Sequence, residues 1–449
     1  MGKRAFAVKC IANMKTSQIP LLVFFLLFIA LDVNFARCTS ILDAIDTAYT
    51  KNSLLNAERA ALGGVSENLK QAKSNYLPSI TLDSSYGDVK SGDYQLQTGL
   101  PSDGDFDRNP LSHSLTITQD IFSGFKNYHE YQKATAEILQ AEASLAKIEQ
   151  KILLNVVQGY INVLIDQEKL KFSQENKKFL EKRYELSSQQ FSLGEISKVD
   201  LKQSEAALSV AIANLEQSKI NLDKSKVDYE NVVGEKALDL EPINHTPLLP
   251  DSLDEAIEIA KKSYPLLVEA QQSEIISQHK LKKKYSNFMP SLSLSGSYTQ
   301  SYDSTSSLDY YNQKEITAQL SWPLFQGGKN KSALRKSREE LNEATLILIN
   351  TEKEAIAEVQ HAWNNYFLQD TKIGAAKSSL EAAQLSLDAS VASYEVGESI
   401  TIDVLEAQQG LLEAQIYLIT SINNKHYLSY KLLSTMGLLS RANLINTIE

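Results

Sequence analysis

The chain contains a long internal repeat whose spacing does not change. The segment that begins at Ile121 and ends at Gly234 recurs 203 residues later, from Leu324 to Gly437, and no insertion interrupts the match. One inserted residue in a packed helix would rotate its buried face by about 100°. A repeat this rigid therefore predicts two copies of one long helical unit rather than several independent domains.

Each copy carries a glycine-centred turn between two helical segments. Glycine takes positive φ without a Cβ clash, as a tight reversal between helices requires. An aspartate follows six residues after each glycine. The turns span 191–200 and 394–403, with Phe191, Gly194, Glu195 and Asp200 in the first copy and Tyr394, Gly397, Glu398 and Asp403 in the second. We expect two long helical hairpins whose tips resemble each other.

The segments that lead to these turns are long enough to build a tall structure. Apolar residues recur at three- and four-residue steps over 125–190 and again over 328–395. A continuous helix of that length would span roughly 100 Å at 1.5 Å per residue. A single chain of such helices would expose too much surface, so a cylinder of coiled helix pairs is the expected arrangement.

Prolines separate shorter elements at the start of each copy. Helices are expected over 41–49 and 54–75 before Pro78, and over 253–263 and then, after a break at Pro265, on to about residue 288 before Pro290. The predicted organisation is a signal peptide (1–38), a first structural repeat (39–249) and a second structural repeat (250–449).

Four segments alternate with period two, as β-strands do. They are 79–87, 112–122, 291–302 and 314–325. One face of each is apolar and the other carries small polar residues, a pattern shared by transmembrane barrels and by soluble sheets with one wet face, and alternation alone does not decide between them. The residues predicted to face lipid in a barrel include Leu292, Leu294, Tyr298, Leu320 and Trp322.

Four strands cannot close a membrane barrel, because the smallest bacterial barrels need about eight. A sheet exposed to lipid has no open edge. If this sheet lies in a membrane, several chains must share it, and a trimer would supply twelve strands.

The N-terminus has the features of a secretory signal. Basic residues precede an apolar run from Ile19 to Leu31, which is shorter than the roughly 20 residues of a spanning helix. An uncleaved anchor is the alternative, and Arg37 disfavours a lipoprotein site at Cys38. Removal of 1–38, with five basic residues and one acidic, would leave no cysteine and a formal charge of −14. That charge argues against nucleic acid as a partner.

No catalytic, metal-binding or cofactor motif is evident. The glycines and lysines at 327–332 lack phosphate-loop spacing, and Asp103, Asp105 and Asp107 lack the glycine and glutamate of a calcium loop. The six histidines contain no i, i+4 pair for zinc. Lys282, Lys283 and Lys284 form a solvated face or meet phospholipid headgroups of the inner leaflet.

The chain resembles the TolC-type outer-membrane channel proteins of Gram-negative bacteria over about 41–439. The resemblance rests on the duplication, two N-[YF]-x-P-S strand entries, two [IL]-F-x-G-x-K-N strand exits and the paired tips. It implies a mainly α fold, a homotrimeric α-helical tunnel continuous with a shared 12-stranded β-barrel, four strands per chain. Such ducts are not enzymes and serve type I secretion or multidrug efflux. Their partners are a periplasmic adaptor and an inner-membrane ABC, RND or MFS transporter.

The resemblance also implies roles for tip residues. Acidic side chains of the inner hairpin ring the opening, and the matching positions are Asp403 and Glu406, with Asp200 equivalent in the first copy. The tips would also meet the adaptor. Related channels hold the closed state by contacts between hairpins, one at the position of Tyr394 and one from a basic residue where this chain has Ser399.

Two other classes of protein share some of these features. A periplasmic adaptor has a long helical hairpin, but only one, flanked by compact β modules. A coiled-coil scaffold outside the membrane would leave the alternating strands unexplained.

Overall fold

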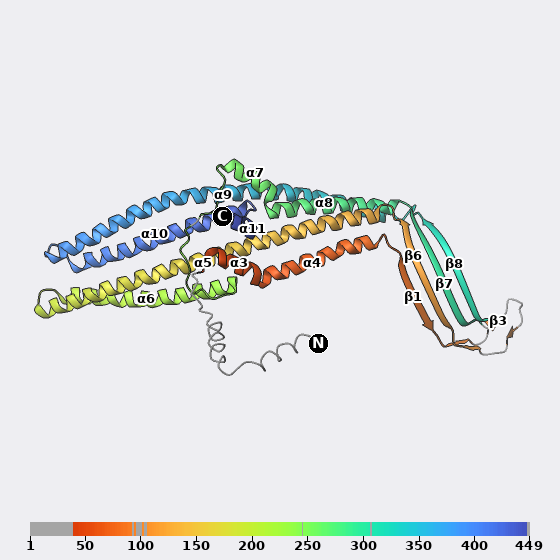
Figure 1. Ribbon diagram of the computed structural model, residues 1–449, viewed down its shortest axis with the longest axis horizontal. Coiled ribbons are helices and arrows are strands. Elements are labelled where there is room, and N and C mark those ends of the chain that lie inside the picture. The colour runs from red at the N-terminus through yellow and green to blue at the C-terminus, as the bar shows by residue number, and fades with distance from the viewer. Residues whose placement is uncertain are drawn as a thin grey trace, which may run out of the picture.

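A computed structural model describes residues 39–91, 94–95, 101–102, 106–244, 246–305 and 308–446. The predicted signal peptide and both cysteines lie outside the described residues, as do Asp103 and Asp105. The molecule is an elongated helical bundle that bends into a sheet at one end (Figure 1).

The helices follow the same order in both halves of the chain. The first half contains α3 (Ile41–Lys51), α4 (Ser53–Ser74), α5 (Lys126–Leu193) and α6 (Lys198–Val233). The second half contains α7 (Leu253–Ser263), α8 (Pro265–Tyr285), the 3-10 turn η1 (Ser286–Phe288), α9 (Lys329–Glu395), α10 (Thr401–Thr435) and α11 (Arg441–Asn446).

The longest helices, α5 and α9, have 68 and 67 residues and run the length of the bundle. Helices α4 and α6 lie end to end along α5, and α8 and α10 lie in the same way along α9 (Figure 1). The prediction of long helices over 125–190 and 328–395 is confirmed to within a few residues. Pro265, predicted as a break, is the first residue of α8, where its missing N–H has no helical partner to lose.

The sheet is antiparallel, with strand order β1-β6-β7-β8. Its strands are β1 (Ser79–Tyr86), β6 (Leu111–Phe122), β7 (Ser291–Thr305) and β8 (Leu308–Ser321). The loop between β1 and β6 adds two short two-stranded ribbons. In one, β2 (Val89–Ser91) pairs with β5 (Phe106–Arg108), and in the other, β3 (Tyr94–Gln95) pairs with β4 (Pro101–Ser102).

The predicted strand 314–325 is wrong at both ends. β7 continues to Thr305, which pairs with Leu308, so β8 starts earlier than predicted. At the other end Ser291 pairs with Ser321, and the preceding Pro290 has no N–H to continue the ladder. Trp322 therefore lies beyond the strand, where its Nε1 donates a hydrogen bond of 3.1 Å to the Phe288 carbonyl.

The register confirms that apolar side chains share one face. Ile80 pairs with Ile117, which pairs with Gly296, which pairs with Ile316, so one apolar row crosses all four strands. Ile80 is 65% exposed and Ile316 is 84% exposed. Leu292 and Leu320 form another cross-strand pair, and Leu294 and Tyr298 lie on the same face of β7. Lys314, opposite Tyr298, is a departure from the apolar pattern.

A repeated contact joins the helix ends that border the sheet. The Asn127 side-chain amide donates to the Asn75 carbonyl at 3.0 Å, and the Asn330 amide donates to the Asn287 carbonyl at 3.0 Å. Each bond links the start of a long helix to the end of the short helical segment that precedes the strands. The helix ends that lead into and out of the strands are thus held together in the same way in both halves.

The main hydrophobic core lies in the middle of the bundle and includes Tyr160, Tyr229 and Tyr430. The Tyr160 hydroxyl lies 2.8 Å from the Thr39 carbonyl and 2.7 Å from the Glu241 carbonyl, where its one proton can bond either oxygen. Burial raises the pKa of Tyr229 to about 12. None of the helices in the described part of the chain is long and apolar enough to cross a membrane.

Two glycines separate the effect of positive φ from that of packing. Gly397 and Gly437 both have φ of 79°, but a Cβ at Gly437 would lie 2.1 Å from the Ser263 carbonyl oxygen, whereas one at Gly397 would have nothing within 4 Å. We expect Gly397→Ala to lower the free energy of unfolding by about 1–2 kcal/mol. Gly437→Ala should cost several kcal/mol more, because the backbone must also move. Thermal unfolding followed by circular dichroism in detergent measures both, and equal losses would contradict the packing argument.

Candidate functional site

Both hairpins end at the same side of the bundle in closely matched turns (Figure 1). Gly194 has φ of 78° and Gly397 has φ of 79°, as the sequence predicts. The Glu195 amide bonds the Gln190 carbonyl at 2.9 Å, and the Glu398 amide bonds the Ser393 carbonyl at 2.9 Å. These bonds satisfy the last carbonyls of each long helix and hold the reversal in one conformation. Phe191, Gly194, Glu195, Gly397 and Glu398 are all exposed at the tips.

The aspartate after each turn begins the returning helix. In the first copy the Asp200 carboxylate accepts bonds from the Ser197 backbone and hydroxyl at 3.1 and 2.7 Å, and the Asp200 amide donates back to the Ser197 hydroxyl at 3.2 Å. This reciprocal pair is a capping box. Asp200 therefore has a structural reason to be present, whether or not it also lines an opening.

Asp403 accepts a similar but not identical set of bonds. Its carboxylate accepts one hydrogen bond of 2.7 Å from the Ser399 hydroxyl and another of 3.1 Å from the Ile400 backbone amide. These two bonds hold the pKa of Asp403 below its ordinary value, so it carries its charge at neutral pH. Glu406 lies three residues further along α10, and both carboxylates are exposed in the single chain. Ser399 thus supports the start of its own helix instead of bonding the other hairpin.

The two hairpins are joined at Tyr394. Its hydroxyl donates to the Gln190 side-chain oxygen on α5 at 2.8 Å. The Arg183 guanidinium, also on α5, lies over the Tyr394 ring with 3.9 Å between its central carbon and the ring centroid. A hydrogen bond of this kind contributes about 1 kcal/mol and a desolvated cation–π contact up to about 2 kcal/mol. We call Arg183, Gln190 and Tyr394 the inter-hairpin latch.

Arg183 is an unusual residue for this position. It is only 8% exposed, and its Nε and Nη2 have no hydrogen-bond partner among the described residues. Burial lowers the pKa of Arg183, while Tyr394 and Glu395 act in the opposite direction. An arginine stays charged in proteins, so the face of the Tyr394 ring is the main compensation for this buried charge.

Apolar contacts extend the latch along the hairpins. Leu405 of α10 packs with Leu180 of α5, and the buried Gln408 side chain donates to Asn176 at 2.9 Å. Leu405 lies between the two candidate gate carboxylates in the sequence. Movement of one hairpin against the other would therefore displace Asp403 and Glu406.

Sequence reasoning identified Tyr394 but missed its partners on α5. The repeat itself carries a signal for them. At the offset of 203, Arg183 corresponds to Ser386, Gln190 to Ser393 and Tyr394 to Phe191. The latch residues are thus positions where the two copies differ in chemistry. In the described part of the chain, no three histidine, cysteine or acidic residues gather into a possible metal site.

The chain matches the family model described as outer membrane efflux protein over residues 44–235 and 256–432. The chain belongs to the outer membrane efflux protein family. It is 26% identical over 396 residues to the outer membrane efflux protein BepC of Brucella suis, with 88% of this chain and 84% of BepC covered. It is 24% identical over 342 residues to the alkaline protease secretion protein AprF of Pseudomonas aeruginosa, covering 74% and 70% of the two chains.

The fold agrees with that assignment. The crystal structure of the outer membrane protein VceC from Vibrio cholerae superposes with a TM-score of 0.77 at 18% identity, over 88% of this chain and 96% of VceC. The protein is thus a TolC-family efflux or secretion channel of the outer membrane, mainly helical with four strands in its principal sheet, and a transport protein by family. This decides against the periplasmic adaptor and the coiled-coil scaffold.

The latch predicts how this TolC-family channel opens. Tyr394→Phe removes the bond to Gln190 but keeps the ring beneath Arg183, and Arg183→Gln removes the buried charge. We expect each change to favour separation of the hairpins, by about fivefold per chain where about 1 kcal/mol is lost. Single-channel recording in planar bilayers would show more frequent openings.

Phe191→Tyr is the matched control, because it changes the same kind of side chain at the exposed tip of the other hairpin. Openings that rise equally in the control, or that stay at the wild-type frequency in both latch variants, would exclude the latch from gating.

Proposed function

We propose that three copies of this chain form a passive export duct, with a shared barrel of twelve strands in the outer membrane and a helical tunnel in the periplasm. The observation that carries the proposal is that, in the described part of the chain, the two edge strands of the sheet have no partner on their outer sides. Within the described residues β1 pairs only with β6 and β8 only with β7, so both edges are free. An exposed apolar face is stable in lipid, but free strand edges are not, unless neighbouring copies complete the sheet.

The proposed gate is the periplasmic end of the tunnel, at the hairpin tips. Threefold symmetry would turn Asp403 and Glu406 into rings of carboxylates, with Asp200 from the first copy nearby, and such rings favour cations. Leu292, Leu294, Tyr298 and Leu320 would face lipid, and Trp322 would lie at the membrane boundary, because it follows the strand.

The proposed partners are a periplasmic adaptor that contacts the tips, through residues such as Phe191, Glu195, Glu398 and Ser399, and an inner-membrane transporter of the ABC, RND or MFS class. The names of two relatives support both kinds of cargo, since BepC is an efflux protein and AprF a protease secretion protein. The duct itself would supply no energy.

Cysteine cross-linking tests the shared sheet. The chain has cysteine only at positions 10 and 38, so the predicted mature protein offers a clean background. Thr81→Cys on β1 combined with Gln319→Cys on β8 should give dimers and trimers on oxidation, because both sites lie near the same end of the sheet but on opposite edges. Denaturing gel electrophoresis resolves the products.

Two further variants carry the β1 cysteine at position 79 or at position 83 in place of position 81, and they test the neighbouring registers between β1 of one copy and β8 of the next. Each single-cysteine variant is a control that cannot form the heterologous contact. If all three registers give only monomers from outer-membrane preparations, the shared barrel is rejected.

Charge-neutral substitutions test the gate. The double variant Asp403→Asn and Glu406→Gln keeps side-chain size and leaves an oxygen acceptor at the helix start, while it removes both carboxylates. We expect the cation preference in planar bilayers to fall toward equality and the conductance to rise. Asp223→Asn with Glu230→Gln removes the same charge from exposed sites far along α6 and should change neither. An unaltered reversal potential in the first variant would remove Asp403 and Glu406 from the gate.

A further inference from the structure

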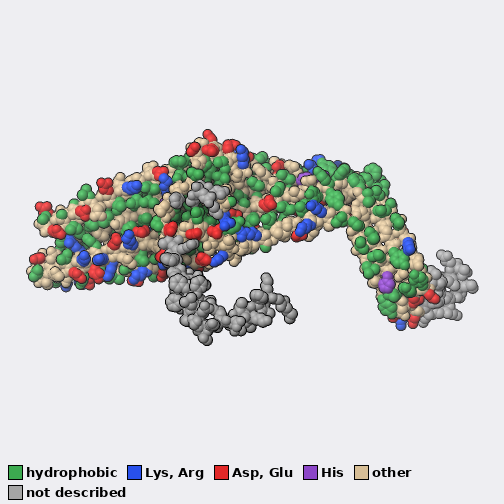
Figure 2. Space-filling model, viewed as in Figure 1, with side chains coloured by type: hydrophobic (Ala, Val, Ile, Leu, Met, Phe, Trp, Pro, Cys, Tyr) green, Lys and Arg blue, Asp and Glu red, His purple; other side chains and the backbone are tan. Residues whose placement is uncertain are grey.

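The part of the bundle next to the sheet is strongly basic. Four segments, 69–78, 122–129, 279–289 and 323–338, contain two, one, four and five lysine or arginine residues and no aspartate or glutamate. The whole chain, in contrast, has a formal charge of −10. We call these four segments the basic collar. Figure 2 shows lysine and arginine side chains along the bundle just before it bends into the sheet.

The four segments lie at one level of the molecule. The bond from Asn127 to Asn75 joins the first two, and the bond from Asn330 to Asn287 joins the last two. The two pairs also touch each other. Gly124 of the second segment lies so close to the third segment that a Cβ added at Gly124 would be 2.9 Å from the Met289 Cβ. The collar is therefore continuous across the foot of all four strands.

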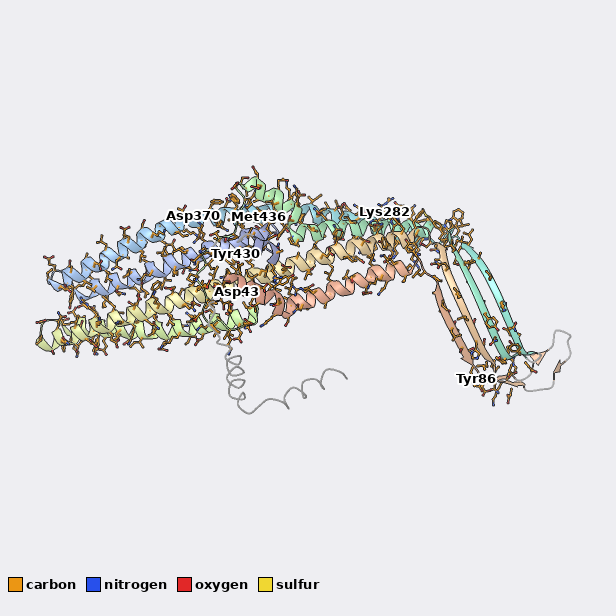
Figure 3. All side chains as sticks on the ribbon, viewed as in Figure 1. Asp43, Tyr86, Lys282, Asp370, Tyr430 and Met436 are labelled. Carbon is orange, nitrogen blue, oxygen red and sulfur yellow. The ribbon has the colours of Figure 1, made fainter. Side chains whose placement is uncertain are left out.

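Much of its charge has no counterpart within the chain. Lys283 pairs with Glu130, and Lys336 lies 3.6 Å from Glu340. Seven other basic residues of the collar are exposed, and their side chains form no ion pair or hydrogen bond with a described residue, namely Lys73, Lys126, Lys280, Lys282, Lys329, Lys331 and Arg335. Lys282 lies on α8 close to the bend (Figure 3). Like charges held this close repel one another, so an anion from outside the chain would stabilise the collar.

Aromatic side chains mark the boundary between the collar and the sheet. Phe125, Phe288, Trp322 and Phe325 are exposed there, Trp322 by 59% and Phe325 by 87%. Tryptophan and other aromatic residues gather at the level of lipid headgroups in membrane proteins. Phe125, Phe288 and Phe325 form the edge of the collar that borders the sheet, and the exposed lysine and arginine residues of the collar lie on the bundle side of them, where headgroup phosphates would be found.

We propose that the basic collar binds the headgroups of anionic phospholipids in the leaflet that faces the helical bundle. Basic residues close to an anionic lipid surface gain about fivefold each in binding, and the effect decays within about 10 Å at ordinary salt. The collar thus sets the depth of the channel in the membrane and selects its surrounding lipid. This goes beyond the export function, which needs no lipid selectivity.

The full-length protein, purified from outer membranes, tests the collar in mixed micelles of phosphatidylglycerol and phosphatidylethanolamine. Native mass spectrometry measures the ratio of the two lipids retained. The collar variant carries Lys280→Gln, Lys282→Gln, Lys329→Gln, Lys331→Gln and Arg335→Gln. We expect wild type to retain phosphatidylglycerol preferentially and the collar variant to lose at least fivefold of that preference.

The matched control removes five exposed lysines elsewhere on the bundle, by Lys178→Gln, Lys182→Gln, Lys353→Gln, Lys372→Gln and Lys377→Gln. It should behave as wild type. An equal ratio in all three proteins, or an equal loss in the control and the collar variant, overturns the proposal. A salt titration of the wild-type protein does not depend on the folding of any variant. A preference for phosphatidylglycerol that does not weaken as the salt concentration rises also overturns the proposal. Planar-bilayer conductance of the collar variant tests the duct separately.

Discussion

The backbone groups at the two free edges of the sheet govern the whole architecture. A strand edge in lipid leaves N–H and C=O groups without partners, at a cost of several kcal/mol for each group. Strands β1 and β8 are such edges, and the chain has no further long strand among its described residues to cover them. Because each long helix follows a strand of the sheet directly in the same chain, copies that complete the sheet also set the number of hairpins in the tube.

The helical part could be predicted from the sequence because its determinants are local and periodic. A constant offset of 203 residues, apolar steps of three and four, and glycines at both reversals indicated α5 and α9 with nearly correct ends, and indicated that a returning helix follows each of them. The end of β8 could not be predicted in this way, because it depends on where Pro290 removes a hydrogen-bond donor from the neighbouring strand. The ribbons in the long loop likewise depend on pairing between distant residues.

The latch was only half predicted, for a related reason. Tyr394 lies in a duplicated motif, but Arg183 lies within a long helix, near its C-terminal end, where an arginine normally indicates a solvated surface. Its burial follows from the contact with the Tyr394 ring at the end of α9, which no single-helix pattern contains. Comparison of the two copies is more informative than periodicity here, because Ser386 stands at the position that corresponds to Arg183.

The differences between the copies would let a duplicated protein keep one hairpin fixed while the other moves. If both hairpins carried identical contacts, a change that released one would release the other. Arg183 and Gln190 of the latch come from α5, and the Tyr394 hydroxyl comes from α9. Phe191, at the position in the first copy that corresponds to Tyr394, has no hydroxyl. The candidate gate carboxylates Asp403 and Glu406 lie on α10, the helix that returns from the α9 tip. Separation at Tyr394 would therefore move Asp403 and Glu406 while the contacts of α5 with α6 remain intact.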